Sequence, residues 1–210
     1  MARFLSPQAN GMYRLNFDAL DGDMMKVSFA DPVPLPLQWP MGNLPPQKIY
    51  GSGAPVSKEN LPTKLRVAGR KRQLVDFNTA YHIYLVSRRF IDLVEGFQTD
   101  LQYFSVDCIW KDKTPAGQYF FFFTMVMLDA VIREKTTATW SPTLPGKGIW
   151  QPRLDLGQTF AFDKSRLGNT HIWVDPNMPT NGALVSDALY ASLRRADIES
   201  FQESPIFQEV

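Results

Sequence analysis

The most regular pattern of apolar and polar positions lies in the middle of the chain, from residue 81 onward. Alternation predicts a short strand that ends at Val86, and Ser87 is then well placed as an N-cap, because its hydroxyl can accept a free first-turn N–H. A stripe at helical spacing follows, formed by Phe90, Ile91 and Val94. We expect Gly96 to end this helix in the left-handed conformation.

Two longer strands are predicted next. Residues 101–110 alternate strictly, with Leu101, Tyr103, Ser105 and Asp107 on one face and Phe104, Val106, Cys108 and Trp110 on the other. Residues 111–117 form a polar turn. The Phe-rich segment 118–126 has no polar alternation, so we expect a strand that is buried on both faces.

The same outline recurs near the C-terminus. Ser186 is a second predicted N-cap, the helical stripe is Leu189, Leu193 and Ala196, and a strand is expected over 197–201. Shorter strands are predicted at 159–163 and 171–174. Together these elements indicate an α+β fold, with a mixed, mostly antiparallel sheet and a few helices docked on a common sheet.

The first 62 residues differ from the rest because they hold nine of the sixteen prolines. We predict a strand at 13–17 that pairs with 24–29 across the Asp21-Gly22-Asp23 turn. Residues 32–62 should be irregular and extended, either wrapped over the domain or reaching a partner as an arm. We therefore expect one structural domain, in which a Pro-rich segment (1–62) packs on an α+β domain (63–210).

Composition narrows the functional classes. The chain has 22 basic and 21 acidic residues, a balance that argues against a general nucleic-acid or membrane-surface binder. A basic run, Lys64 to Arg72, lacks interleaved aromatic residues and is typical of a solvated face or turn, although an acidic partner or phosphate would also fit it. The chain has one cysteine, no apolar run of bilayer length and no signal-peptide pattern, so we expect a cytoplasmic protein.

The residues that most often carry chemistry are sparse. His82 and His171 flank predicted strands and are interpreted as packed or surface side chains, and Cys108 as a buried, inert thiol. The sequence has no HExxH, no Gly-rich phosphate loop and no GxSxG motif. We therefore predict no enzyme activity, no metal and no cofactor.

Residues 136–157 contain two tryptophans and three prolines without a period, which predicts a long structureless loop. Such loops are often functional, and Trp and Arg are enriched among residues that dominate binding energy. Trp140, Trp150 and Arg153 are therefore the candidate partner-binding residues. The alternative is that both tryptophans fold back and cap the core.

From Val86 onward the chain resembles a family of bacterial proteins. The matching segments are VSRRFIDLVEG, DLQYFSVD, GQYFFFFTMVMLDAVIREKT, FAFDKSRLGNTHIWV and VSDALYASLRRADIESF. They are similar to the immunity proteins of polymorphic-toxin systems, in the family numbered eleven, whereas the first 62 residues and the Trp140–Trp150 loop lie outside this likeness or depart from it. The family supplies no catalytic residues. Asp129, Arg133 and Glu134 match its most recognisable polar positions and are expected to be structural.

The resemblance implies a cytoplasmic protein that binds and neutralises a cognate toxin of a type VI secretion or related contact-dependent system. The toxin would be encoded by an adjacent gene, and the immunity protein would be a monomer or homodimer with no nucleic-acid or membrane partner. The alternative is a small-molecule-binding protein or an enzyme with an unrecognised site, lined by the abundant aromatic residues.

Overall fold

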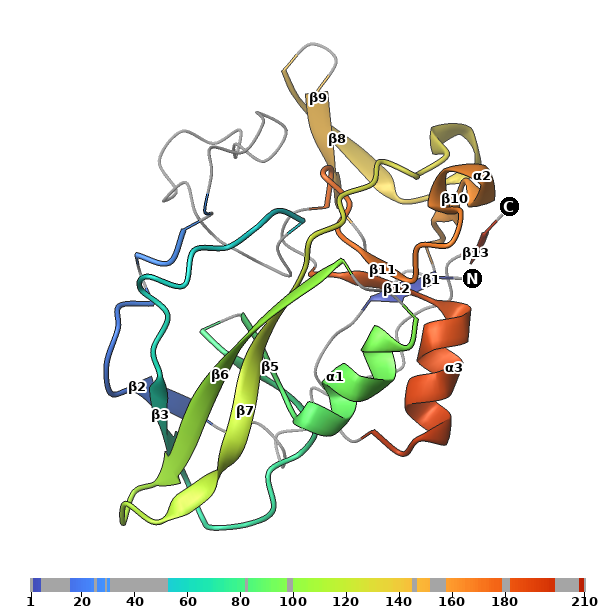
Figure 1. Cartoon of the computed structure of the whole chain (residues 1–210). Coiled ribbons are helices and arrows are strands. Elements are labelled where there is room, and N and C mark those ends of the chain that lie inside the picture. The colour runs from blue at the N-terminus through green and yellow to red at the C-terminus, as the bar shows by residue number, and fades with distance from the viewer. Residues whose placement is uncertain are drawn as a thin grey trace.

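A computed structural model of the chain describes residues 2–4, 16–24, 26–28, 30, 53–81, 83–97, 100–144, 147–151, 158–178, 182–198 and 208–209. At its centre is a six-stranded sheet with the order β2-β3-β6-β7-β5-β4 (Figure 1). Its strands are β2 (Asn16–Ala19), β3 (Lys64–Ala68), β4 (Phe77–Ala80), β5 (Ile83–Val86), β6 (Leu101–Trp110) and β7 (Pro115–Thr124). Within this sheet only β3 and β6 pair in parallel, and the other neighbouring strands pair antiparallel. The predicted α+β fold with a mixed, mostly antiparallel sheet is therefore confirmed.

The β6–β7 hairpin is the longest paired unit of this sheet, with Leu101 opposite Thr124 and Cys108 opposite Gly117. The predicted two-sided burial of β7 is confirmed: its phenylalanines alternate between two separate core clusters, with Phe120 and Phe122 in one and Phe121 and Phe123 in the other. β7 begins earlier than predicted, at Pro115, because the turn is short. The Trp110 amide donates to the Thr114 carbonyl at 2.8 Å and closes it.

Both predicted N-caps are confirmed. Ser87 Oγ accepts the Phe90 amide at 3.2 Å at the start of α1 (Arg88–Glu95), and Ser186 Oγ accepts the Leu189 amide at 3.2 Å at the start of α3 (Asp187–Arg195). Phe90, Ile91 and Val94 are buried as expected, as are Leu189 and Leu193, whereas Ala196 is half-buried and lies at the C-cap of α3. The left-handed ending at Gly96 is wrong: its φ is −68°, and the chain leaves through a turn in which the Phe97 amide donates to the Val94 carbonyl.

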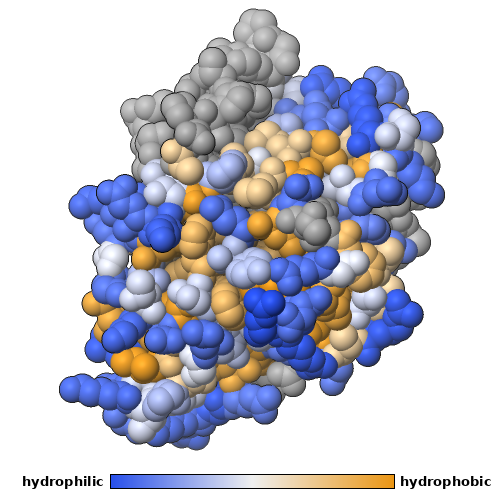
Figure 2. All heavy atoms as spheres, viewed as in Figure 1, coloured by the Kyte–Doolittle hydropathy of each residue, from blue (hydrophilic) through white to orange (hydrophobic). Residues whose placement is uncertain are grey.

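The sheet curls until its two edges approach each other. The Tyr81 hydroxyl, in the β4–β5 turn, accepts the amide of Ala19 on edge strand β2 at 3.0 Å. The curled inner face encloses a hydrophobic cluster that includes Phe17, Leu65 and Leu85. On the face shown in Figure 2, hydrophilic residues dominate the rim and hydrophobic residues gather toward the centre.

The predicted pairing of residues 13–17 with 24–29 is wrong. β2 pairs instead with β3, and the described residues between 24 and 28 form no strand. Asp21 explains the preference, because its carboxylate accepts the amides of Thr63 and Lys64 at 2.9 and 3.0 Å and ties the end of β2 to the start of β3. In β3, exposed Lys64 and Arg66 alternate with buried residues, so part of the basic run is a solvated face, as predicted.

The remaining elements lie above α1 and α3 in the view of Figure 1. They are β1 (Ala2–Phe4), the 3-10 helix η2 (Arg133–Lys135), β8 (Thr139–Leu144), β9 (Lys147–Gln151), β10 (Ala161–Phe162), α2 (Lys164–Leu167), β11 (Ile172–Trp173), β12 (Leu184–Ser186) and β13 (Gln208–Glu209). They form a three-stranded sheet, β1-β12-β11, and two pairs, β8-β9 and β10-β13.

Here the sequence predictions are confirmed in part. The strands expected at 159–163 and 171–174 exist as the shorter β10 and β11. The strand at 197–201 is wrong where it is described, because Asp197 has a φ of 50° and ends the turn after α3. The two helices also do not share a sheet: α1 packs against β7, whereas α3 packs against β12 and β1.

Within the Pro-rich segment 1–62, residues 31–52 lie outside the described residues, and so do the predictions for 32–52. The described part packs on the domain. Val56 and Leu61 are buried, and the Gln102 side chain bonds both the amide and the carbonyl of Val56, at 2.7 and 2.9 Å. A division of the chain at residue 62 stays a prediction.

Candidate partner-binding surface

The segment that carries the candidate tryptophans is a β-hairpin rather than the predicted structureless loop. β8 and β9 pair antiparallel, with Trp140 directly opposite Trp150. Cross-strand aromatic pairs stabilise such hairpins, and these two rings meet edge to face with centroids 5.0 Å apart. The prolines argued against a strand in this segment, because proline is rare inside paired strands. Pro142 nevertheless lies inside β8, where a register shift accommodates it.

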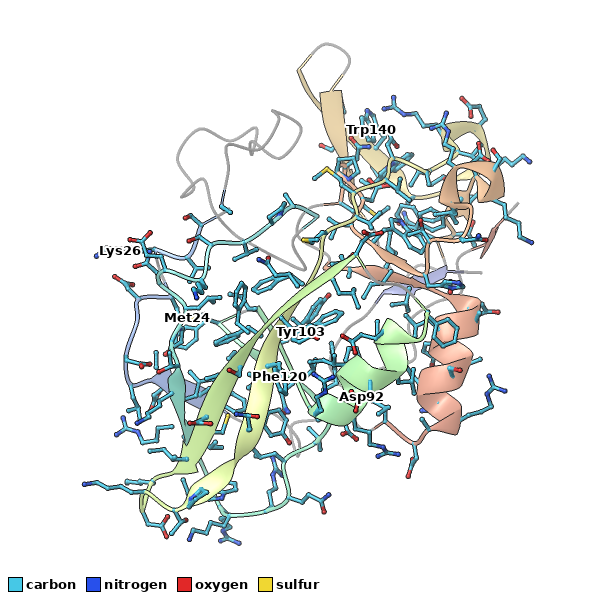
Figure 3. All side chains as sticks on the ribbon, viewed as in Figure 1. Met24, Lys26, Asp92, Tyr103, Phe120 and Trp140 are labelled. Carbon is cyan, nitrogen blue, oxygen red and sulfur yellow. The ribbon has the colours of Figure 1, made fainter. Side chains whose placement is uncertain are left out.

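The two tryptophans begin a series of aromatic contacts that runs from the hairpin into the core. We call it the aromatic ladder: Trp140, Trp150, Phe160, Phe162 and Trp173, with successive centroids 5.0, 5.7, 6.3 and 5.8 Å apart. Trp150 is only 5% exposed and caps the core, as the alternative interpretation predicts. Trp140, half-buried, forms the outer end of the ladder (Figure 3).

Trp140 is held in place by the strand opposite it. Its indole lies so close to the backbone of Gly148 that a Cβ at that position would be 2.5 Å from two ring carbons. Any other residue at 148 would therefore displace the ring. Gly148 therefore gives the indole room to lie against β9.

Arg133 completes this surface. It begins η2, is exposed, and its guanidinium carbon lies 4.1 Å from the centroid of the Trp140 ring. This distance is well within the range of a cation–π interaction. The resemblance singled out Asp129, Arg133 and Glu134 as structural positions. Asp129 and Glu134 are exposed too, and the Asp129 backbone carbonyl accepts a bond from Arg166 at 3.0 Å.

Arg153, the third candidate residue, lies outside the described residues, so the structure brings together only Trp140 and Trp150. The residue that sequence reasoning missed as a surface partner is Arg133. Arg133 follows the aromatic strand and precedes Trp140 by seven positions in the sequence. Nothing in that spacing alone predicts the contact.

Below the hairpin lies a buried carboxyl group. The Trp150 amide donates to the Asn177 carbonyl at 2.9 Å, and the Asn177 amide donates to Asp175 Oδ1 at 2.7 Å. Burial raises the pKa of Asp175 to about 7, with a smaller contribution from the Asp129 charge. Its Oδ2 is buried and has no hydrogen-bond partner among the described residues, and the same is true of Trp173 Nε1. A buried carboxyl of this kind is costly to ionise.

The other candidates for chemistry are packed. His171 Nδ1 is 2.8 Å from Ser186 Oγ and its ring meets Phe97 edge to face. Burial, with a smaller effect of Asp107, raises the pKa of the Cys108 thiol to about 12, which keeps it protonated. His82 lies outside the described residues. Among those that are described, no three His, Cys, Asp or Glu side chains gather as metal ligands would.

No helix in the described part of the chain has the length and apolar character needed to cross a membrane. Exposed Arg133 on η2 and half-buried Trp140 on the β8–β9 hairpin lie side by side. Such residues are typical of protein-binding surfaces.

Comparison with known families agrees with a binding role. The model of the Immunity protein family (Imm11) matches residues 37–206, and the chain therefore belongs to this family of immunity proteins. The match is wider than the resemblance that began at Val86, since it takes in part of the Pro-rich segment and the whole β8–β9 hairpin. A search of curated proteins finds no match to the chain.

Proposed function

We propose that this immunity protein acts in the cytoplasm by binding a cognate toxin in a stoichiometric complex, without catalysis. Membership of the immunity family is the observation that carries the proposal. An inhibitor that occupies a surface needs a rigid scaffold and a few anchoring side chains, and the aromatic ladder with its exposed end supplies both.

The partner we propose is the product of an adjacent gene, delivered by a type VI secretion or related contact-dependent system. The immunity protein would meet it as a monomer or homodimer.

The contact surface we propose is the hairpin face around Trp140, which we call the Arg133–Trp140 surface. Trp140 and Arg133 are accessible there, whereas Trp150 is buried and would act by supporting Trp140. Arg153 follows β9 by two positions and is proposed as a further contact on the strength of the sequence.

Co-expression tests the proposal. The product of the adjacent gene is expressed in a susceptible bacterium with and without this chain, and the two proteins are then co-purified. We expect growth arrest without the immunity protein, rescue with it, and a complex of fixed stoichiometry. Rescue by far less immunity protein than toxin would indicate an enzyme. A harmless neighbour that does not co-purify would contradict the proposal.

Trp140→Ala locates the interface. Removal of a central aromatic anchor commonly weakens binding by about 30-fold or more. Tyr81→Ala is the control, because Tyr81 is an exposed aromatic in the β4–β5 turn; thermal unfolding confirms that the variant stays folded without its bond to Ala19. Equal affinity of the Trp140 variant and the unaltered chain would place the toxin on another surface.

A further inference from the structure

Two arginines in the described part of the chain lie over aromatic rings. Arg88, at the start of α1, is 5.7 Å from the Tyr103 ring centroid and 6.0 Å from that of Phe120. Arg133 is 4.1 Å from the centroid of Trp140. The two pairs resemble each other in kind, but their surroundings differ in charge.

Arg88 is already neutralised by its own helix. Its Nε lies 2.7 Å from Asp92 and its Nη2 lies 3.5 Å from Glu95, whose other oxygen accepts the Tyr103 hydroxyl at 2.7 Å. Figure 3 shows Asp92, Tyr103 and Phe120 gathered beside α1, away from Trp140. This guanidinium therefore has its carboxylates within the molecule.

Arg133 has no such partner. Within the described residues its guanidinium makes no hydrogen bond and no ion pair; its contact is with the Trp140 ring. A guanidinium carries five N–H donors in one plane, and lying over an aromatic ring leaves the donors at its edge available. The geometry thus presents an unsatisfied fork of donors beside an aromatic surface.

The backbone under Arg133 is fixed before any partner arrives. The Ile132 amide donates to the Ala161 carbonyl at 2.8 Å, and Thr136 Oγ donates to the Ile132 carbonyl at 2.8 Å. The same hydroxyl accepts the Ala161 amide at 3.1 Å. Hydrogen bonds thus hold η2 against β10, and Trp140 packs against Gly148. Binding would therefore order few additional groups.

We propose that Arg133, held on Trp140, receives a carboxylate side chain, Asp or Glu, from the toxin. Carboxylates match the guanidinium fork in a two-pronged geometry, and the neutralising partner that Arg88 has within its own helix would here come from the other protein. This inference rests on the proposed function, because it names the chemistry by which the toxin engages the Arg133–Trp140 surface.

Titration of the adjacent gene's product with the purified immunity protein, by calorimetry, tests the inference. We expect Arg133→Ala to weaken binding by about 30-fold or more, and Arg133→Lys by about 10-fold, because an ammonium keeps the charge but loses the fork. Arg88→Ala, the matched control with an internally neutralised guanidinium, should stay within about two-fold. Thermal unfolding of each variant confirms that it is folded.

Two further measurements identify the group that Arg133 binds. The affinity of the unaltered chain should fall as salt rises, more steeply than that of Arg133→Ala. One toxin Asp→Asn or Glu→Gln substitution should weaken the unaltered complex by at least about 10-fold, and have little effect once Arg133 is alanine.

The outcomes separate the inference from the proposed function. If the unaltered chain binds and rescues but Arg133→Ala binds equally well, the inference is overturned and the proposed function stands. The inference is also overturned if the Arg133→Ala loss is insensitive to salt and adds to every acidic substitution in the toxin. If the unaltered chain binds no toxin, the proposed function falls and the inference falls with it.

Discussion

The curled sheet and the aromatic ladder are two regions of one chain that are stabilised differently. In the sheet, ten-residue strands pair along their length, and β7 is buried on both faces by two core clusters. In the ladder region, strands of two to six residues surround a line of rings, and a carboxyl oxygen and an indole N–H are buried without partners in the described part of the chain. The comparison shows a scaffold fixed by backbone pairing beside a surface fixed by side-chain contacts.

The difference accords with the roles we propose. A scaffold gains from satisfied polar groups, whereas unpaired groups mark regions where stability is not at its maximum. The ladder region also carries Arg133, which forms no ion pair with any described residue, while the arginine beside the sheet is neutralised. We therefore expect substitutions in the sheet to act on stability alone, and substitutions around the ladder to act on binding or on the pH dependence of stability.

The largest effect is expected from Phe122→Ala in β7. Phe122 is fully buried and meets Phe90 edge to face at 5.4 Å, so its loss leaves a cavity between the sheet and α1. We expect the free energy of unfolding to fall by about 3–5 kcal/mol in urea denaturation followed by circular dichroism. Phe104→Ala, a half-buried residue of β6, is the control and should cost less than half as much. Equal costs would mean that the full burial of Phe122 adds nothing to its contribution to stability.

Asp175→Asn should stabilise the protein, increasingly so as pH rises. The pKa of Asp175 is raised from its ordinary value of 3.8 to about 7 in the folded protein. The stability contributed by the protonated carboxyl is therefore fully present below pH 3.8 and is lost as the pH rises through 7. By linkage the cost of ionisation reaches at most about 4 kcal/mol near neutrality. Urea denaturation at several pH values between 4 and 8 should show the two proteins converging at the acidic end. A difference that is constant across this range would show that the pKa of Asp175 is the same in the folded and unfolded states.

The smallest effect compares the two serine caps. Ser87→Ala should cost about 1 kcal/mol or somewhat more, because its hydroxyl caps α1 and also donates to Asp76 Oδ1 at 2.6 Å. Ser186→Ala should cost up to about 2 kcal/mol, because this buried hydroxyl also contacts His171 Nδ1 at 2.8 Å. Thermal unfolding of the two variants measures the difference directly. If Ser87→Ala proved the costlier, the Ser87–Asp76 bond would contribute more to stability than the Ser186–His171 contact.

Local patterns in the sequence predicted the sheet region well. Strict alternation gives β6 its bounds and faces, and a hydroxyl before a helical stripe gives both caps, because each signal lies within one element. The pairing of β2 with β3 could not be predicted, because β3 lies more than 40 positions further along the chain. Asp21 fixes this pairing through its bond to the Lys64 amide. A nearby turn offered a local alternative that the chain does not use.

The candidate surface was predicted by residue type and not by shape. Trp140 and Trp150 were chosen because such residues dominate interfaces, yet the fold buries one and exposes part of the other. Which tryptophan remains accessible depends on Gly148 and on the position of η2, both of which are set by pairing between distant segments. The burial of Asp175 likewise follows from the fold and has no signal in the neighbouring residues.

The run of four phenylalanines in β7 also bears on how the protein folds. A short apolar, uncharged, aromatic segment is a hazard for aggregation while it is exposed. β6 is its neighbour in sequence as well as in space, so the hairpin closes over a short turn and shields one edge of β7 early, since local contacts form fastest. β5 then pairs with the other edge of β7, so this aggregation-prone strand is not an edge strand of the folded sheet.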